Sequence, residues 1–198
     1  MGSVVLDMSM SLDGFIAGPD DGPDNGLGVD GHRLHAWLAE GDGIDPLSYR
    51  PDDASAVVFD EMMATGAVLV GRRTFDIAGH WDGDHHDGVP IFVPTHHPPA
   101  DPPTGAATVT YVTDGIASAA SQAKAAAGER NVMFHGAETA QDALRAGVLD
   151  EMELHVMPVL LGRGRRLFDH LGADHIELEL TRSIDAPGVT HLHYRVLR

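Results

Sequence analysis

The sequence AVLVGRRTFD, at residues 67–76, joins a short apolar strand to the start of a helix through a single glycine. Four consecutive apolar residues closed by glycine are typical of a buried strand, and Thr74 opens a helical turn. Backbone N–H groups at a helix start attract phosphate, and arginine adds charge and bidentate hydrogen bonds. Gly71, Arg72, Arg73 and Thr74 therefore form a candidate nucleotide-phosphate site. The alternative is a capped helix beside two surface arginines.

A second strand–glycine–helix unit lies in FHGAE, at residues 134–138. Its small residues would let a ligand approach the backbone closely. A dinucleotide needs two such places, one for its pyrophosphate and, in NADPH, one for the 2′-phosphate. Neither unit has the GxGxxG spacing of a doubly wound domain, and GRGRRL at residues 162–167 matches only its first half. A doubly wound dehydrogenase is therefore disfavoured.

Strands and helices alternate over the first two thirds of the chain. We expect strands at residues 4–10, 67–70, 90–94, 107–112 and 131–134, and helices at residues 32–40, 54–64, 115–127 and 137–146. The last third contains three strand-like segments, which predicts antiparallel pairing, at residues 151–161, 175–182 and 189–197. The polar segment 18–31 is either a mobile lid or a solvated loop. We predict one α/β domain over residues 1–198, with a mixed, mostly parallel central sheet flanked by helices.

Composition limits the function classes. The chain has 198 residues, 43% of them hydrophobic, which suits one domain. A net charge of −17 disfavours nucleic acid and anionic membranes as partners. Because the start lacks a basic flank and a long apolar run, we expect a cytoplasmic protein. With no cysteine and a single lysine, Lys124, phosphate recognition must use arginine, histidine or helix N-termini.

The 13 histidines raise the question of a metal. His85 and His86 lie in an acidic loop, where we expect them to be solvated, and His191 and His193 would share one face of a strand. No HExxH or comparable spacing occurs in the sequence. We therefore expect no catalytic metal.

Five motifs, taken in chain order, resemble one family. They are MSLDGFIA at 10–17, GRRTF at 71–75, VPTHH at 93–97, FHGA at 134–137 and VLDEMELHVMPVLLG at 148–162. The combination resembles the dihydrofolate-reductase-like proteins, which include the C-terminal reductase domain of the bifunctional riboflavin-biosynthesis deaminase/reductase. The resemblance implies a three-layer α/β fold, with NADPH across the C-terminal ends of the strands. It also implies a homodimer, because several family members pair through their sheets.

The resemblance also assigns residues to the cofactor. Backbone groups would hold the nicotinamide carboxamide and flank the reactive ring at Ser9, Ile16 and Ala17. Phosphates would be held by Gly71, Arg72, Arg73 and Thr74, with Arg72 on the 2′-phosphate. The adenosine end would contact Thr95 and His96, and helix N–H groups would meet the pyrophosphate at Gly136, Ala137 and Glu138.

Two positions depart from the family pattern. His135 stands where members often have the first of two glycines joined by a cis peptide, and its side chain would lie beside the cofactor. Dihydrofolate reductases present a carboxylate from the first helix, whereas residues 32–38 here are HRLHAWL. Dihydrofolate is therefore disfavoured as the substrate, and His35, Asp60, Glu61 or bound water would supply the proton.

We expect an NADPH-dependent reductase that acts on a small heterocycle, either a pterin or a ribosylaminopyrimidine, or on a carbonyl compound. The alternative is a non-catalytic nucleotide-binding module or a degenerate family member, because fold does not fix function.

Overall fold

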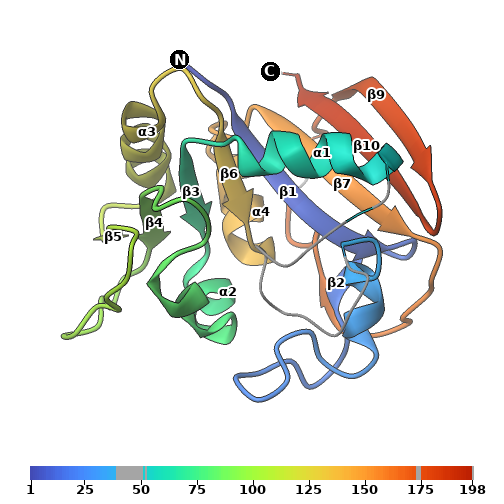
Figure 1. Cartoon of the computed structure of the whole chain (residues 1–198), viewed down its shortest axis with the longest axis horizontal. Helices are drawn as coiled ribbons and strands as arrows, with labels where there is room; N and C mark the ends of the chain where they lie inside the picture. Colours follow the sequence, from blue (N-terminus) through green and yellow to red (C-terminus); the bar gives the residue numbers. More distant parts are fainter. Residues whose placement is uncertain (39–50, 52, 173–174, 198) are drawn as a thin grey trace.

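The computed structural model describes residues 1–38, 51, 53–172 and 175–197. Its main sheet has the strand order β5-β4-β3-β6-β1-β7-β10-β9. The strands are β1 Val4–Ser11, β3 Ala67–Val70, β4 Ile91–Pro94, β5 Val109–Val112, β6 Val132–His135, β7 Glu151–Met157, β9 Leu178–Ala186 and β10 Val189–Val196. The six strands from β5 to β7 are parallel, and β10 is antiparallel to both β7 and β9. The predicted mixed sheet with antiparallel C-terminal strands is confirmed (Figure 1).

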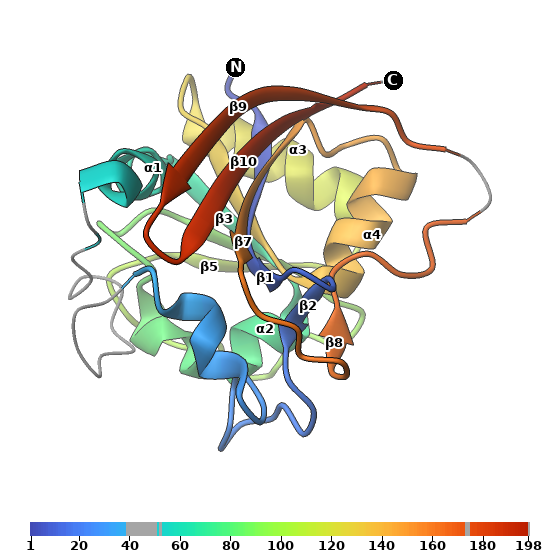
Figure 2. The same cartoon turned by 90° about the vertical axis from the view of Figure 1, so that its right-hand side faces the viewer.

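Helices cover both faces of the sheet, which makes three layers (Figure 2). The layer on one side contains α1 Asp53–Met63, α2 Arg72–Ile77 and the short 3-10 helices η1 Gly31–His35 and η3 Gly79–Gly83. The layer on the other side contains α3 Ile116–Ala127 and α4 Ala137–Arg145. Two further strands pair apart from the main sheet, β2 Phe15–Ala17 with β8 Arg165–Arg166.

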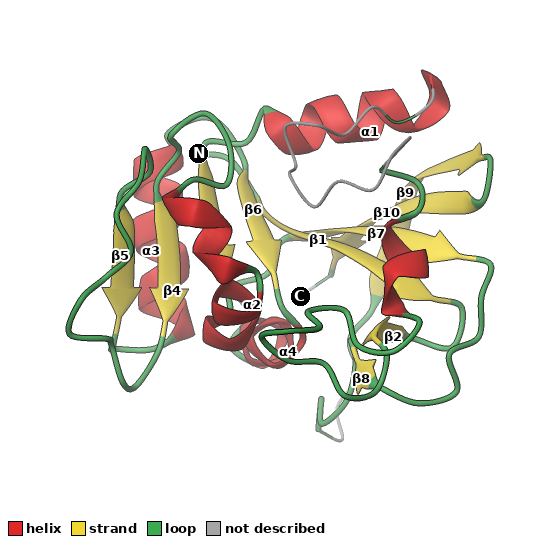
Figure 3. Cartoon of the chain, turned by 60° about the horizontal axis from the view of Figure 1, so that its bottom comes forward, coloured by secondary structure: helices red, strands yellow, loops and turns green. Residues whose placement is uncertain are grey.

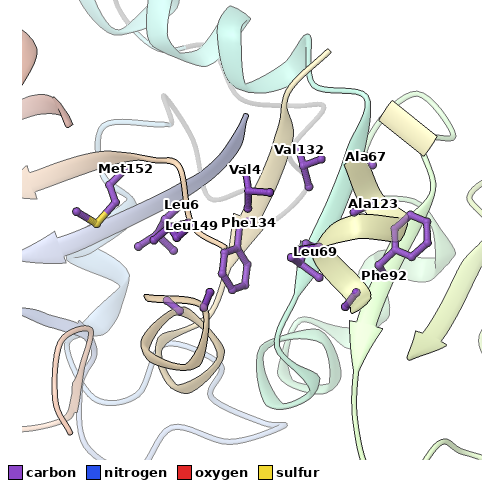
Figure 4. Close-up of a cluster of buried hydrophobic side chains, with 14 of the residues drawn as sticks. Val4, Leu6, Ala67, Leu69, Phe92, Ala123, Val132, Phe134, Leu149 and Met152 are labelled. Carbon is purple, nitrogen blue, oxygen red and sulfur yellow. The ribbon is translucent and has the colours of Figure 1, made fainter. Parts of the chain in front are cut away.

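The main core lies between the sheet and helices α3 and α4 (Figure 4). Val4, Leu6 and Phe134 point to this side and are completely buried. They meet alanines of the two helices, such as Ala123 and Ala140, whose small side chains allow close approach of helix and sheet. Burial of this apolar face is the main source of stability, at roughly 25 cal/mol per Å².

The opposite face of the central strands is polar. Alternate residues of β1, β6, β7 and β10 turn towards α1 and η1, because side chains alternate across a strand. They include Asp7, Ser9, His135, Glu151, Glu153, His155, His191 and His193. His191 and His193 therefore share a face, as the alternation predicted. In these four strands the ionisable side chains lie on one face, and the other face joins the main hydrophobic core.

Three predicted elements differ from the structure by three residues or more at one end at least, and the others differ by at most two. The helix expected at 32–40 is the 3-10 helix η1, and residues 39 and 40 lie outside the described part of the chain. Strand β7 stops at Met157, because the next residue is a proline, which has no N–H for the ladder. Strand β9 runs to Ala186 rather than 182, since its hairpin with β10 turns at residues 187–188 and sets the register.

The expectation that His85 and His86 are solvated is wrong. The two residues are 6% and 0% exposed. The His85 ring packs edge-on against Trp81 and stacks on His135, with centroids 4.5 and 5.4 Å away, and His86 Nε2 lies 3.3 Å from the Thr65 hydroxyl. The prediction relied on the acidic residues next to these histidines, but packing against other aromatic rings buries both side chains.

Candidate functional site

A cavity of about 680 Å³ lies at the carboxyl ends of four parallel strands. The residues just beyond β3, β4, β5 and β6 all line it, namely Gly71, Thr95, Thr113 and Gly136. The arrows of β4, β5 and β6 in Figure 3 point to this common edge. Ligands of open α/β sheets bind at this edge, outside the strand ends, which makes the cavity the candidate cofactor site.

The two strand–glycine–helix units meet in this cavity. A Cβ atom on Gly71 would lie 2.4 Å from Thr139 Oγ1, so a larger residue there would displace the Thr139 side chain. Gly136 has φ +113°, a conformation that favours glycine, and a Cβ on it would lie 3.1 Å from Thr74 Oγ1. Gly136 also precedes the first turn of α4 and gives it no side-chain cap. The glycines keep a narrow, backbone-lined cradle open.

Four arginines line the cavity, namely Arg72, Arg73, Arg145 and Arg165. Two carboxylates, Glu138 and Asp142, also line it, which leaves a local balance of +2 in a chain of net charge −17. Asp21 and Asp76, which do not line the cavity, pair with three of these arginines. The positive excess is therefore confined to the lining itself, where it favours an anionic ligand.

Acidic and carbonyl oxygens hold the arginines in place. Arg72 Nε donates to both carboxylate oxygens of Asp76 at 2.8 Å, and its Nη1 donates to the carbonyl of His97 at 2.7 Å. Arg73 and Arg165 share the carboxylate of Asp21, at 3.0 and 3.1 Å. Burial alone would raise the pKa of Asp21, but the two guanidinium groups lower it. The guanidinium groups are thus pre-positioned around the cavity.

The structure brings nine of the thirteen predicted cofactor residues to this cavity. They are Gly71, Arg72, Arg73, Thr74, Thr95, His96, Gly136, Ala137 and Glu138. The other four, Ser9, Ile16, Ala17 and His135, are not among its lining residues. Ser9 Oγ accepts a hydrogen bond of 2.8 Å from Trp37 Nε1, and Ile16 and Ala17 are buried in β2.

His135 closes β6 on the polar face of the sheet. Its Nδ1 lies 2.8 Å from the backbone oxygen of Asp7 and donates to it, since a carbonyl can only accept. Burial lowers the pKa of His135, so the imidazole is neutral at physiological pH. The described residues contain no cis peptide bond, so the bond between His135 and Gly136 is trans.

The three candidates for proton donor lie in different surroundings. His35 in η1 lies near Asp7, His135 and His155, and its pKa falls to about 4, chiefly through burial and then through the two other imidazoles. Asp60 is exposed on α1. Glu61 accepts two hydrogen bonds from Arg182, at 2.8 and 2.6 Å, and is not among the residues that line the cofactor cavity.

A buried polar chain on the same face was not predicted. His155 Nε2 lies 3.2 Å from Asp7 Oδ1, His155 Nδ1 lies 2.8 Å from His191 Nδ1, and His191 Nε2 lies 3.1 Å from Ser55 Oγ. Burial alone would raise the pKa of Asp7, but its interaction with His155 lowers it below the usual value. The alternation of β7 could have placed His155 on the polar face. Its contact with Asp7 could not be predicted, because Asp7 is 148 residues away in sequence.

Comparison with known proteins agrees with this architecture. A family model, the RibD C-terminal domain, matches residues 2–192. The chain belongs to this family. No curated protein sequence matches the chain. Within the described residues, no helix is both long and apolar enough to cross a membrane.

Solved structures share the fold of this RibD C-terminal family member. A Shewanella protein named for riboflavin biosynthesis is 23% identical over 99% of both chains, with a TM-score of 0.73. Acinetobacter baumannii RibD is 18% identical, with a TM-score of 0.62; all of this chain matches 58% of that one. Dihydrofolate reductase from Enterococcus faecalis, complexed with NADP(H), is 13% identical over 100% of this chain and 98% of its own, with a TM-score of 0.58. These likenesses establish the dihydrofolate-reductase-like fold.

Proposed function

We propose that this protein is an NADPH-dependent reductase that transfers hydride to a small heterocycle, pterin-like or ribosylaminopyrimidine-like, or to a carbonyl compound. One observation carries the proposal, namely the cavity at the strand ends, where four arginines gather around two glycine-containing helix starts in a chain of net charge −17. Family membership points the same way, and dihydrofolate reductase of the same fold binds NADP(H).

The residues of the cavity fit the cofactor. Gly71 and Gly136 leave the backbone open where a Cβ would crowd Thr139 and Thr74, and the cavity volume of about 680 Å³ suits a ligand of this size. We propose that N–H groups at the start of α4 bind the pyrophosphate and that Arg72 binds the 2′-phosphate. Bound NADPH would supply the hydride.

The proton that accompanies the hydride would reach the substrate from the polar face of the sheet. We propose that His35 takes this role, because it lies near Asp7, His135 and His155 and, although burial governs its pKa, part of its surface stays accessible to solvent. With a pKa of about 4, its imidazole is neutral at pH 7. It would therefore orient a water molecule that delivers the proton, rather than act as a strong acid. Asp60 and Glu61 are weaker candidates, since one is exposed and the other is paired with Arg182.

Equilibrium titration tests the cofactor assignment. In the Arg72→Ala variant we expect NADPH affinity to fall by about 10- to 150-fold, the value of a charge-assisted hydrogen bond of 1.5–3 kcal/mol, with little change for NADH. Arg195→Ala is the matched control, because Arg195 pairs with Glu179 on the surface. Equal NADPH affinity in wild type and Arg72→Ala would contradict the assignment of Arg72.

Turnover is tested separately. NADPH absorbance is followed while the protein is mixed with pterins, aminopyrimidines and small carbonyl compounds. Oxidation with one class names the substrate class. Tight NADPH binding without oxidation across the panel would instead favour a non-catalytic nucleotide-binding module.

We also propose a homodimer that forms through the outer strands β9 and β10. Leu178 and Leu180 on β9 are 40% and 52% exposed, and they lie opposite Val196 and Tyr194 of β10. An apolar edge strand invites pairing with a second copy. Sedimentation should give a dimer for wild type and a monomer for Leu180→Glu; a monomeric wild type would refute the proposal. The cytoplasmic location and the absence of nucleic-acid partners stay predictions.

A further inference from the structure

We propose that Glu153, His155 and His191 form a binding site for a divalent transition-metal ion of the zinc class. These three buried residues offer ligand atoms that all lie within 4.8 Å of one another. Glu153 and His155 are two positions apart on β7 and share a face, and His191 lies directly opposite His155 on β10. Two paired strands thus hold three donor groups on a rigid surface.

The outer ring nitrogens of both histidines already have oxygen partners. His155 Nε2 donates to the carboxylate of Asp7, and His191 Nε2 lies within hydrogen-bond distance of Ser55 Oγ. Metal-binding histidines commonly hold their outer N–H on a carboxylate, carbonyl or water, which fixes the ring and directs the inner nitrogen at the ion. Here both inner nitrogens are Nδ1 atoms, and they face each other at 2.8 Å.

Glu153 supplies the observation that favours an ion over a proton shared between the imidazoles. Its Oε2 accepts hydrogen bonds from His193, at 2.5 Å, and from Arg182, at 3.1 Å. Its Oε1 is buried and has no hydrogen-bond partner among the described residues, although Glu153 is only 4% exposed. A proton shared between the imidazoles gives this anionic oxygen no partner from the described residues, whereas an ion bound to all three residues would use it as a ligand.

Space for a water molecule lies on the Glu153 side of the group. Asp7, Glu61 and Glu153 line a small cavity of about 50 Å³, which His155 and His191 do not line. This volume holds a few water molecules, since one needs roughly 10–15 Å³ on this measure. Three protein ligands and a water would complete a tetrahedral site. Two nitrogens at ~2.1 Å from a tetrahedral ion lie about 3.4 Å apart, so the imidazoles would separate by roughly half an ångström.

The donor set selects the kind of ion. Two imidazoles and one carboxylate suit Zn²⁺, Co²⁺, Ni²⁺ or Cu²⁺, whereas Mg²⁺ and Ca²⁺ require a shell of oxygens. Trp37 covers the group, with its ring centroid 4.3 Å from His155 and 4.9 Å from His191. A paramagnetic ion bound there would quench the fluorescence of Trp37. The chain has only one other tryptophan, Trp81.

The test uses tag-free, chelator-treated protein and the metal ions alone. Calorimetric titration with ZnCl₂ should show saturable binding of one ion per chain. His155→Gln and His191→Gln should each weaken binding at least tenfold. His86→Gln is the matched control, because His85 Nδ1 and His86 Nδ1 are also 2.8 Å apart but belong to no such group of three in the part of the chain that the structure describes. In Trp81→Phe, Co²⁺ should quench the remaining fluorescence.

Several outcomes would overturn the proposal. They are no saturable binding of Zn²⁺, equal affinity in His191→Gln and wild type, or loss of binding in His86→Gln. If the glutamine variants fail to fold, nitrogen-15 NMR of the wild type decides: a proton that remains on Nδ1 of either histidine at saturating Zn²⁺ rules out the site. NADPH titration of the same samples keeps this result independent of the reductase assignment.

Discussion

Replacement of Gly136 by alanine tests the central cradle. Gly136 has φ +113° and ψ 141°, which an alanine adopts only under strain of about 1–3 kcal/mol. The added Cβ would also lie 3.1 Å from Thr74 Oγ1 and 3.4 Å from the nitrogen of Gly71. We expect the free energy of unfolding to fall by about 2 kcal/mol, which lowers the melting temperature of a domain of this size by roughly 4–8 °C.

The same substitution should weaken cofactor binding. The new methyl group would stand between the two strand–glycine–helix units, where we propose that backbone N–H groups bind phosphate. Loss of one hydrogen bond to a charged group is worth about 1.5–3 kcal/mol, so NADPH affinity should fall at least tenfold. Fluorescence titration measures this affinity, and thermal unfolding measures the stability.

Gly147→Ala separates strain from crowding. Gly147 also has positive φ, +66°, but nothing lies within 4 Å of its Cβ position and it does not line the cavity. Alanine there should cost about 1–2 kcal/mol of stability and leave NADPH affinity unchanged. If Gly136→Ala binds NADPH as tightly as Gly147→Ala does, the cofactor does not lie in the cradle and the reasoning fails.

Three further variants probe other parts of the fold. The hydrogen bond to Glu151, and then that to Glu153, raises the pKa of His193 to about 9. The protonated imidazole therefore stabilises the folded state fully below pH 6.5, and this contribution disappears as the pH rises through 9. Urea unfolding in chelator should show His193→Gln less stable than wild type by about 1–3 kcal/mol at pH 6 and nearly equal at pH 10; a constant difference would contradict this. Phe134→Ala should lose about 3–5 kcal/mol at all pH values, since the ring is completely buried, and a loss below 1 kcal/mol would place it outside the core. Gly164→Ala would set a Cβ 2.1 Å from a carbonyl oxygen of β2, so limited proteolysis should cut this region faster than in wild type, and an unchanged rate would refute the close approach.

Local signals were enough to predict the fold class. The continuous apolar run at residues 67–70 and the strand–helix alternation predict buried parallel strands, and the three segments after residue 150 predict antiparallel ones. Both predictions are confirmed. Element ends were less predictable, because hairpin pairing sets them as much as composition does. Strand β9 shows this, since its pairing with β10 carries it to Ala186.

The candidate site was predictable only where its parts are contiguous in sequence. Gly71–Thr74 and Gly136–Glu138 each carry a local pattern, and both line the cavity. By contrast, Arg165 reaches the same cavity from β8 and pairs there with Glu138, 27 residues earlier. No periodicity in a single segment encodes such a contact, because chain topology alone brings the two side chains together.

The division between the two sheet faces connects stability with function. The face towards α3 and α4 is apolar and contributes to the largest cluster of buried hydrophobic residues among those described. The face towards α1 and η1 buries Asp7, Glu153, His155 and His191, whose desolvation opposes folding. A fold optimised for stability alone would place apolar residues there. Almost all of these buried groups are paired with one another or with nearby polar side chains, as buried charges require, and they are the groups to which we assign the proposed proton transfer and the proposed metal ion.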